Sequence, residues 1–365
     1  MSLKRRRKQA ADRAKTAGLD ALLVTHLPDV RWLCGFTGSN AALVLLCGAG
    51  ARGRVVLFTD RRYTTQTKAE AAGTQVVIAP QVVKAACEWM AAARVKRCGF
   101  DDGNTSVAAL QQMRAAVPSA VRRKMFEPVG SLVAGLRWVK DADEIAKMRA
   151  AAALGCRLFD GILYTMQAGM TEVAVAAEME YAARIAGAEA MSFPTIVASG
   201  ERSALPHGQA SRAKLPKRGF VTLDFGVVLD GYCSDMTRTV HMGPARPGER
   251  DAYDAVLEAQ EAGVASVRAG VAAGDVDEAA RSVLRKAGLA DWFTHSTGHG
   301  VGLEIHEGPR LAAKQTQALK AGMVVTIEPG IYMPGRFGVR IEDTVLVTAK
   351  GGEILTPSTK AWIEL

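Results

Sequence analysis

The sequence lacks the features of membrane-spanning and exported proteins. None of the apolar runs in its 365 residues approaches the roughly 20 residues that a membrane-spanning helix needs, and the longest, such as residues 41–46, are as short as a strand. The first eight residues are basic, like the start of an export signal, but a polar stretch follows them where such a signal has an apolar one. We therefore expect no membrane association and no export signal.

Cysteines are also few, and they are scattered. None stands in the CxxC spacing that is typical of zinc sites, and six are too few for a fold that disulfide bonds stabilise. We interpret them as small buried residues of a protein in a reducing cytoplasm: Cys34, Cys47, Cys87, Cys98, Cys156 and Cys233.

Basic residues exceed acidic ones, which gives a net charge of +9 and raises the question of nucleic-acid binding. The lysines and arginines are dispersed, however, and no helix-turn-helix, zinc-finger or RNA-binding motif accompanies them. The basic cluster at residues 4–8 is interpreted as a solvated first turn of a helix. We expect no nucleic-acid partner.

The length suffices for two domains, each with its own core. Residues 1–135 alternate short β-rich runs with helical stretches, a pattern that predicts an α/β domain with a mixed sheet. Residues 136–365 open with two helices, at about 142–167 and 172–186, and Asp141 is the expected N-cap of the first. Strands and helices then follow in blocks, which predicts an α+β domain.

The first pair of candidate metal ligands comes from a predicted β-hairpin. An Asp-Gly pair at 230–231 is typical of a two-residue hairpin turn, and the resulting register places Asp224 opposite Thr237. Asp235 then lies diagonal to Asp224 on the same face, at the roughly 7–8 Å that separates diagonal neighbours. A solvent-facing acidic pair is the alternative. The other face of the first strand is wholly apolar, so the strand is expected to be buried, and metal binding is favoured because an unpaired buried carboxylate is costly.

A second pair of carboxylates, Glu328 and Glu342, lies in β-rich runs joined by a glycine-containing loop. Half of the six histidines fall within residues 295–309, between the two pairs: His295, His299 and His306. Four carboxylates and one imidazole form a ligand set for two divalent ions. Oxygen-rich donors favour Mn²⁺, whereas an imidazole also suits Co²⁺, Fe²⁺ or Zn²⁺. Two such ions activate a water and polarise a carbonyl, which points to hydrolysis.

The ordered motifs LDFG, SDMTR, TGHGVG, TIEPG and RIEDT resemble those of the pita-bread metallopeptidases, and they carry Asp224, Asp235, His299, Glu328 and Glu342. The N-terminal motifs WLCGFTGS and TDRRY resemble the creatinase-type N-terminal domain of the proline-specific branch. The resemblance covers nearly the whole chain. It implies a creatinase-type domain at 1–135 and a pita-bread catalytic domain at 136–365.

The resemblance also implies roles for the ligands. Asp224 would bind one ion, Asp235 and Glu342 would bridge the two, and His299 and Glu328 would complete the other. Glu328 would also carry the proton to the departing prolyl nitrogen.

The same resemblance implies roles for three histidines, and the sequence itself offers two candidate arginines. His207 and His306 match histidines that hold the substrate and stabilise the tetrahedral intermediate, and His295 matches another histidine of the pocket. Arg340 would orient Glu342 or contact the substrate, with a surface arginine as the alternative. Arg310 is a candidate for binding a substrate carboxylate, with an exposed loop arginine as the alternative.

The activity expected from the resemblance is that of a cytoplasmic, homodimeric Xaa-Pro aminopeptidase acting on short proline-containing peptides, with an Xaa-Pro dipeptidase as the alternative. Methionine aminopeptidases share the five ligands but lack the N-terminal domain, and creatinase lacks the ligand set. A peptide-binding relative without catalysis is a further alternative, but such relatives typically lose ligands, and this sequence retains all five.

Overall fold

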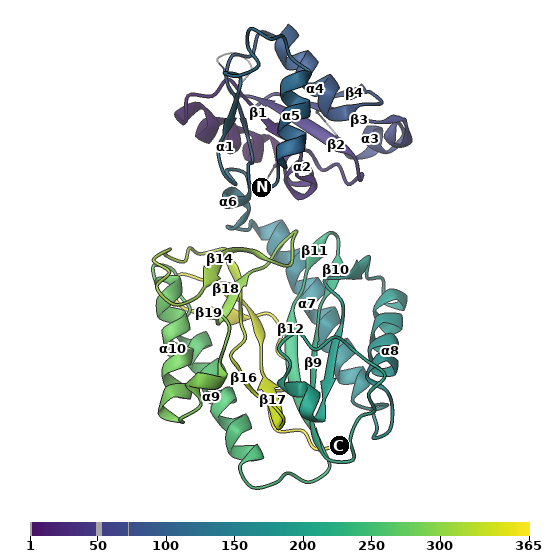
Figure 1. The fold of residues 1–365 in the computed structure, drawn as a ribbon, viewed down its shortest axis with the longest axis vertical. Coiled ribbons are helices and arrows are strands. Elements are labelled where there is room, and N and C mark those ends of the chain that lie inside the picture. The colour runs from purple at the N-terminus through teal and green to yellow at the C-terminus, as the bar shows by residue number, and fades with distance from the viewer. Residues whose placement is uncertain (1, 49–52, 72) are drawn as a thin grey trace. The chain divides into compact units, whose positions relative to one another are not determined.

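The computed structural model describes residues 2–48, 53–71 and 73–365, and the chain divides into two compact units, Met1–Arg137 and Trp138–Leu365 (Figure 1). The predicted boundary between residues 135 and 136 falls inside helix α6 (Ala134–Arg137). The last residue of this helix, Arg137, is buried and donates a hydrogen bond to Asp29 at 2.6 Å, so α6 is tied to the first unit. Within the described residues, no helix is both long and apolar enough to cross a membrane.

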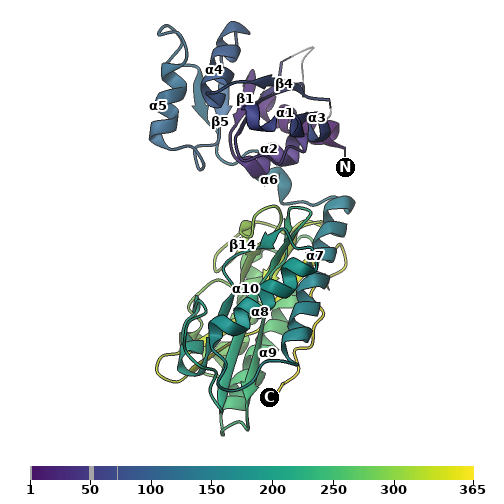
Figure 2. The ribbon, with the colours of Figure 1, turned by 90° about the vertical axis from the view of Figure 1, so that its right-hand side faces the viewer.

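The first unit contains a six-stranded mixed sheet in the order β4-β3-β2-β1-β5-β6. Except for the antiparallel pair β2 and β3, its strands are separated by helices, as the α/β pattern predicts. Helices α4 and α5 cover one face of the sheet, and α1 and α2 cover the other (Figure 2). Because both faces are covered, central strands such as β2 are apolar throughout. The strands are β1 (Ala21–Val24), β2 (Ala41–Leu46), β3 (Val55–Thr59), β4 (Gln75–Ile78), β5 (Cys98–Phe100) and β6 (Phe126–Pro128). The helices before α6 are α1 (Leu3–Thr16), α2 (Leu27–Cys34), α3 (Gln66–Glu70), α4 (Val82–Ala92) and α5 (Val107–Ala115).

The basic first turn of α1 differs from the prediction. Lys4, Arg5 and Lys8 are exposed, but Arg6 and Arg7 are buried. Arg7 donates to the carbonyl of Leu33 at 2.8 Å, and the guanidinium of Arg6 lies 5.1 Å from the centre of the Trp32 ring. The expectation of a fully solvated turn is therefore wrong for these two residues, because each finds its partner in α2.

The cysteines form no disulfide, and five of the six are buried, as predicted. Burial raises the pKa of the Cys34 thiol to about 11 and that of Cys87 to about 12, since the thiolate is poorly solvated in the core. Cys156 is half-buried. Low reactivity toward oxidants follows for the buried thiols.

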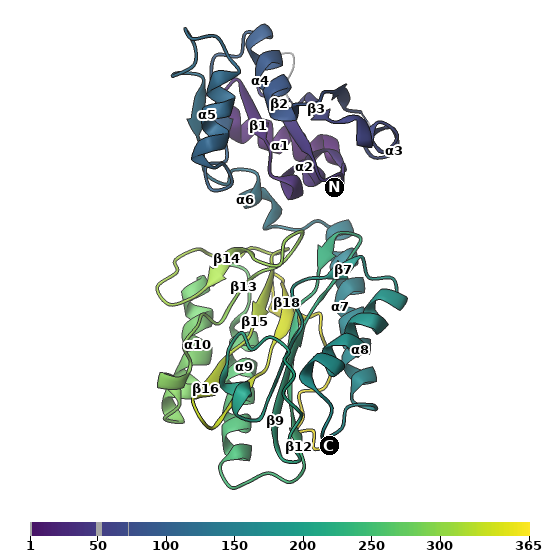
Figure 3. The ribbon, with the colours of Figure 1, turned by 45° about the vertical axis from the view of Figure 1, so that its right-hand side comes forward.

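The second unit packs helices on the outer sides of mainly antiparallel strands (Figures 1 and 3), which confirms the α+β class. Helices α7 and α8 cover the sheet of order β12-β9-β8, and α9 and α10 pack on β16 and β17. The helices are α7 (Ala142–Ile162), α8 (Glu172–Ile185), α9 (Glu249–Ser266) and α10 (Ala273–Lys286). The strands are β7 (Ala190–Met191), β8 (Ile196–Ser199), β9 (Gly219–Phe225), β10 (Val227–Leu229), β11 (Tyr232–Cys233), β12 (Met236–Met242), β13 (Gly298–Gly300), β14 (Glu307–Leu311), β15 (Val324–Ile327), β16 (Gly330–Met333), β17 (Phe337–Arg340), β18 (Asp343–Val347) and β19 (Gly352–Ile354).

Two local predictions in this unit are confirmed. Asp141 caps α7 as part of a capping box with Glu144, although the helix ends at Ile162 rather than near residue 167. The Asp-Gly turn sets the predicted register, in which Asp224 on β9 pairs with Thr237 on β12. This register positions the candidate metal ligands.

Candidate metal centre

The register of the hairpin, which is the same on both sides of Gly226, brings Asp235 beside Asp224. The ladder between β9 and β12 stops at Gly226, where a Cβ atom would lie 1.8 Å from the carbonyl oxygen of Ser234. Only glycine allows the two backbones to approach this closely. Asp235 follows Ser234 directly, in the gap between β11 and β12, and its carboxylate converges with that of Asp224.

Glu342 joins these two acids from the connection between β17 and β18. Its carboxylate accepts a hydrogen bond from the hydroxyl of Thr237 at 2.7 Å, and its backbone NH donates to the Thr237 carbonyl at 3.1 Å. Ligand oxygens of Asp224, Asp235 and Glu342 all lie within 4.8 Å of one another, and all three residues are buried. The structure therefore places three of the five predicted ligands in one cluster.

His299 and Glu328 complete the group. Nε2 of His299 lies 3.7 Å from a carboxylate oxygen of Asp235 and 3.5 Å from one of Glu328. Nδ1 of His299 lies 3.0 Å from the carbonyl oxygen of Gly300, which only a protonated nitrogen satisfies, so the unprotonated Nε2 faces the carboxylates. The hydroxyl of Thr326 donates to Glu328 at 3.1 Å.

The buried carboxylates of this cluster repel one another, and a bound cation would reduce that repulsion. Burial raises the pKa values of Asp235 and Glu342 well above their usual range, and the neighbouring carboxylates raise them further. Burial likewise raises the pKa of Glu328 to about 8, and burial lowers the pKa of His299, which favours a neutral imidazole. A divalent ion would offset the repulsion among the carboxylates and uses these donor atoms. The residues present thus fit a centre for divalent ions.

Arg340 is buried beside this centre and contacts Asp224 rather than Glu342. Its guanidinium donates to Asp224 at 2.6 Å, to the hydroxyl of Tyr332 at 2.6 Å and to the carbonyl of Pro206 at 2.9 Å. With 4% of its surface exposed, it is not the surface arginine of the alternative interpretation. Burial raises the pKa of Tyr332 to about 12, so this hydroxyl stays protonated.

A cavity of about 670 Å³ opens over the cluster, and every predicted site residue lines it. His306 packs its ring against that of His299, with the ring centres 4.4 Å apart, and Nε2 of His295 lies 2.8 Å from the Tyr332 hydroxyl. His207 and Arg310 are exposed on the cavity wall. The rest of the lining is apolar at Phe193, Pro194, Ile196, Ile305 and Pro206 and polar at Gln209, Ser296 and Glu307.

Sequence reasoning missed the residue that orders the loop of His207. Glu172, the first residue of α8, is fully buried. Its carboxylate accepts hydrogen bonds from the backbone NH of Ser199 at 2.8 Å, from Arg202 at 3.0 Å and from the hydroxyl of Ser211 at 2.7 Å. These donors flank His207 on both sides. In the sequence, Glu172 has only the pattern of an ordinary acidic residue in a first helical turn.

Residues 146–349 match the metallopeptidase family M24, and residues 6–139 match the creatinase/prolidase N-terminal domain. The chain belongs to metallopeptidase family M24. It is 33% identical over 346 residues to the Xaa-Pro dipeptidase of Pyrococcus horikoshii, an alignment that covers 94% of this chain and 95% of that protein.

Two solved structures are similar to this chain over nearly their whole length. One is the Xaa-Pro dipeptidase from Bacillus anthracis, with a TM-score of 0.94, 36% identity and complete coverage of both chains. The other is the X-Pro aminopeptidase from Thermotoga maritima, with a TM-score of 0.86, 34% identity and coverage of 97% of this chain and 100% of that one. The predicted fold, a creatinase-type domain followed by a pita-bread domain, is confirmed. As a member of M24, the chain is a metallopeptidase that uses divalent ions.

Proposed function

We propose that this M24 metallopeptidase is an Xaa-Pro dipeptidase, which hydrolyses the bond between the first residue and the C-terminal proline of a dipeptide. The observation that carries the proposal is the similarity over the full chain to two proteins named Xaa-Pro dipeptidase, from Bacillus anthracis and Pyrococcus horikoshii. The sequence alone favoured an Xaa-Pro aminopeptidase and kept the dipeptidase as the alternative. The comparisons favour that alternative.

The position of Arg310 supports the proposal. A dipeptidase must recognise the free carboxylate of its C-terminal proline, and an arginine binds a carboxylate with two parallel hydrogen bonds. Arg310 on β14 is the cross-strand partner of His299 on β13, and both side chains line the cavity. No ion pair within the described part of the chain engages the Arg310 guanidinium. It therefore remains available to a substrate.

We assign the five acidic and imidazole side chains as ligands of two divalent ions. Asp224 would bind one ion, His299 and Glu328 would bind the other, and Asp235 and Glu342 would contribute to both. When bound, the ions supply an activated water and polarise the scissile carbonyl. The oxygen-rich donor set favours Mn²⁺, with Co²⁺, Zn²⁺ or Fe²⁺ as alternatives.

The protein's own residues bind the substrate and move the proton. Glu328 accepts a proton from the attacking water and delivers it to the departing prolyl nitrogen. His207 and His306, which both line the cavity, hold the scissile carbonyl and stabilise the charge that develops on its oxygen. His295 and Arg340 bind or orient the substrate beside Tyr332, to which both are hydrogen-bonded.

We also propose a cytoplasmic location and a homodimer. The buried cysteines without disulfides support a reducing compartment. The homodimer rests on the resemblance of the sequence to the proline-specific branch of the family.

An Xaa-Pro aminopeptidase is the second candidate, because the Thermotoga maritima enzyme of that name has 34% identity and a TM-score of 0.86. Such an enzyme must accept chains that continue beyond proline, so it needs no cation for a prolyl carboxylate. A peptide-binding protein without catalysis is the remaining alternative. Unlike both enzymes, it would show no peptide turnover.

Steady-state kinetics on Xaa-Pro dipeptides and Xaa-Pro-Yaa tripeptides, with Mn²⁺ added, tests the proposal. We expect turnover of the dipeptides and little turnover of the tripeptides. Arg310→Ala should raise KM for dipeptides by about tenfold or more, which corresponds to the loss of a charged hydrogen bond. Arg268→Ala, which removes an exposed arginine outside the cavity lining, is the matched control. Equal turnover of both lengths, with no effect of Arg310→Ala, would establish the aminopeptidase instead.

A further inference from the structure

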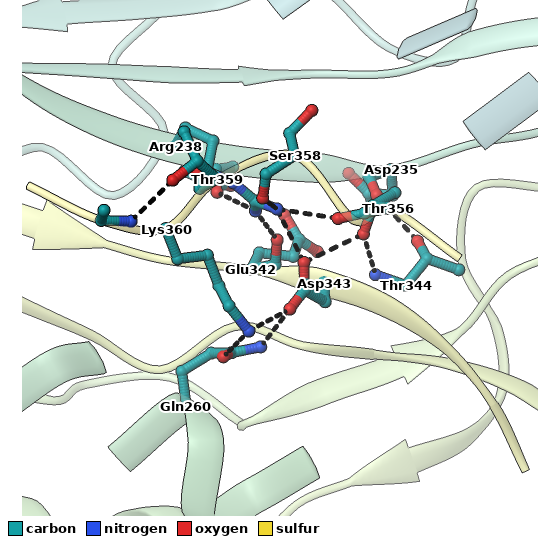
Figure 4. Close-up of polar contacts among 12 residues, drawn as sticks. Asp235, Arg238, Gln260, Glu342, Asp343, Thr344, Thr356, Ser358, Thr359 and Lys360 are labelled. Atoms are coloured by element: carbon teal, nitrogen blue, oxygen red, sulfur yellow. Dashed lines mark hydrogen bonds and ion pairs between the residues drawn. The ribbon is translucent and has the colours of Figure 1, made fainter. Parts of the chain in front are cut away.

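The C-terminal segment at residues 356–360 has no regular secondary structure, yet it packs against the strands that carry two proposed metal ligands (Figure 4). Thr356 and Ser358 are buried, and the backbone carbonyls of the segment point toward β12. Buried carbonyls need hydrogen-bond donors, and one side chain supplies several of them.

That side chain is Arg238, which lies on β12 and is 1% exposed. Its guanidinium donates to the carbonyls of Thr356 at 2.8 Å, Ser358 at 2.8 Å and Thr359 at 3.1 Å. It also donates to the carbonyl of Glu342. One guanidinium therefore joins the C-terminal segment to the backbone of a proposed ligand.

Asp343, the residue after Glu342, connects the same elements through its carboxylate. One oxygen accepts from Arg238 at 2.8 Å and from the hydroxyl of Thr356 at 3.1 Å. The other accepts from Lys360 at 2.6 Å and from Gln260 at 2.9 Å. A fully buried carboxylate is stable only with such partners, so Asp343 depends on Lys360 in the C-terminal segment.

Thr344 connects the network to Asp235, the second proposed metal ligand beside it. Its hydroxyl donates to the backbone carbonyl of Asp235 at 2.7 Å, and its backbone NH donates to the hydroxyl of Thr356 at 3.0 Å. The backbone carbonyls of Asp235 and Glu342 are thus both engaged from the side that faces the C-terminal segment (Figure 4).

We propose that the C-terminal segment is a positioning part of the metal centre. Through Arg238 and Asp343, it holds the backbones of Asp235 and Glu342 so that their carboxylates stay at the separation that two ions require. Arg238, Asp343 and Lys360 touch neither substrate nor ion, and they act through the ligands. The inference rests on the proposed metal-binding role of Asp235 and Glu342, but it is independent of the choice between dipeptidase and aminopeptidase.

The test uses the full chain and Co²⁺ alone as the probe. Lys360→Met removes the cation at the more exposed end of the network, where the lysine side chain is 17% exposed. Because Arg238 stays in place, we expect this variant to fold. We expect the dissociation constant for Co²⁺ to rise by about tenfold, the lower end of the effect of removing a direct partner of a metal ligand, because Lys360 acts through Asp343. We also expect the visible absorption spectrum of bound Co²⁺ to change.

Three further variants test whether the effect is specific to this network. Lys350→Met, an identical substitution in an exposed turn, should leave Co²⁺ binding and the spectrum unchanged. Lys360→Arg, which retains a cation, should bind Co²⁺ nearly as tightly as the wild type. Asp343→Asn should have a larger effect than Lys360→Met, and if it fails to fold, Lys360→Met decides alone.

A purely structural role for the segment gives a different outcome. If Lys360→Met lowers only the unfolding temperature and leaves Co²⁺ affinity and the spectrum as in the wild type, the proposal is overturned. It is also overturned if the wild type binds no Co²⁺. If the wild type binds Co²⁺ with the expected variant effects but cleaves no Xaa-Pro peptide, this inference stands and the proposed function fails.

Discussion

Single residues next to the proposed ligands determine which ligand atoms face the ions. The Thr237 hydroxyl holds one oxygen of Glu342, and the Gly300 carbonyl fixes the tautomer of His299. Arg340 holds one oxygen of Asp224. These contacts restrict the rotation of three of the five proposed ligands, so the orientation of these three is set before an ion binds.

His306 differs from these residues because its contact is with the ring of His299, while its own ring lines the cavity. We expect His306→Ala to lower kcat by roughly 10²–10³-fold, the usual cost of losing one donor to a developing oxyanion. Metal content should stay near the wild-type value. Turnover and metal content must be measured on the same preparation, and if both fall together, His306 supports the metal centre instead of acting on the substrate.

At the scale of elements, the loop that carries His207 depends on the first turn of a helix. The loop follows the short helix η2 (Gly200–Ala204) and has little regular structure of its own. The carboxylate of Glu172, at the start of α8, accepts hydrogen bonds from residues on both sides of this loop. The helix therefore fixes a loop that lies about thirty residues away in the sequence.

Glu172→Gln tests this dependence. The substitution keeps the size of the side chain but removes the charge that pairs with Arg202. We expect kcat/KM to fall by about tenfold or more, because small displacements of a substrate-binding group are costly. Metal content should not change. Glu180→Gln on the exposed side of α8 is the control, and an unchanged kcat/KM in Glu172→Gln would mean that the loop holds its shape without this carboxylate.

The sequence predicts elements and contacts that depend on local chemistry. The Asp-Gly turn alone sets the pairing of Asp224 with Thr237, and the Asp141 cap follows from its neighbours. Partners distant in the sequence are not predictable in this way. Arg340 contacts Asp224 across 116 positions, and nothing in the sequence around either residue distinguishes this partner from Glu342. The burial of Arg7 against α2 is not predictable for the same reason, because its hydrogen-bond partner, Leu33, is distant in the sequence.

At the scale of the whole molecule, the proposed ligands come from segments spread between residues 224 and 342. Each lies on or beside a different strand of the second unit: β9, β12, β13, β15 and β18. Bound ions therefore connect strands that the chain brings together only in the folded state. Ion binding and folding of this unit are expected to be coupled.

Metal removal should reveal this coupling. We expect chelator-treated protein to be inactive and to unfold at a lower temperature, and Mn²⁺ should restore both properties. At a free Mn²⁺ concentration of about 100 times Kd, the expected stabilisation is about 2.7 kcal/mol. Scanning calorimetry of the wild type and of Asp235→Ala provides the comparison, since the variant should gain no stability from Mn²⁺. Full activity in a metal-free preparation would contradict the mechanism.

The buried cysteines lie in both units, so thiol labelling can follow the opening of each unit separately. Cys34, Cys47, Cys87 and Cys98 lie in the first unit and are buried, whereas buried Cys233 lies in the second. A thiol reagent reaches such groups only when the structure around them opens, so the time course of their alkylation reports the opening rate of each unit. Cys233 lies two residues before Asp235. Its labelling rate, followed by mass spectrometry, would report the local opening of the hairpin that carries the metal ligands, without any probe added to the chain.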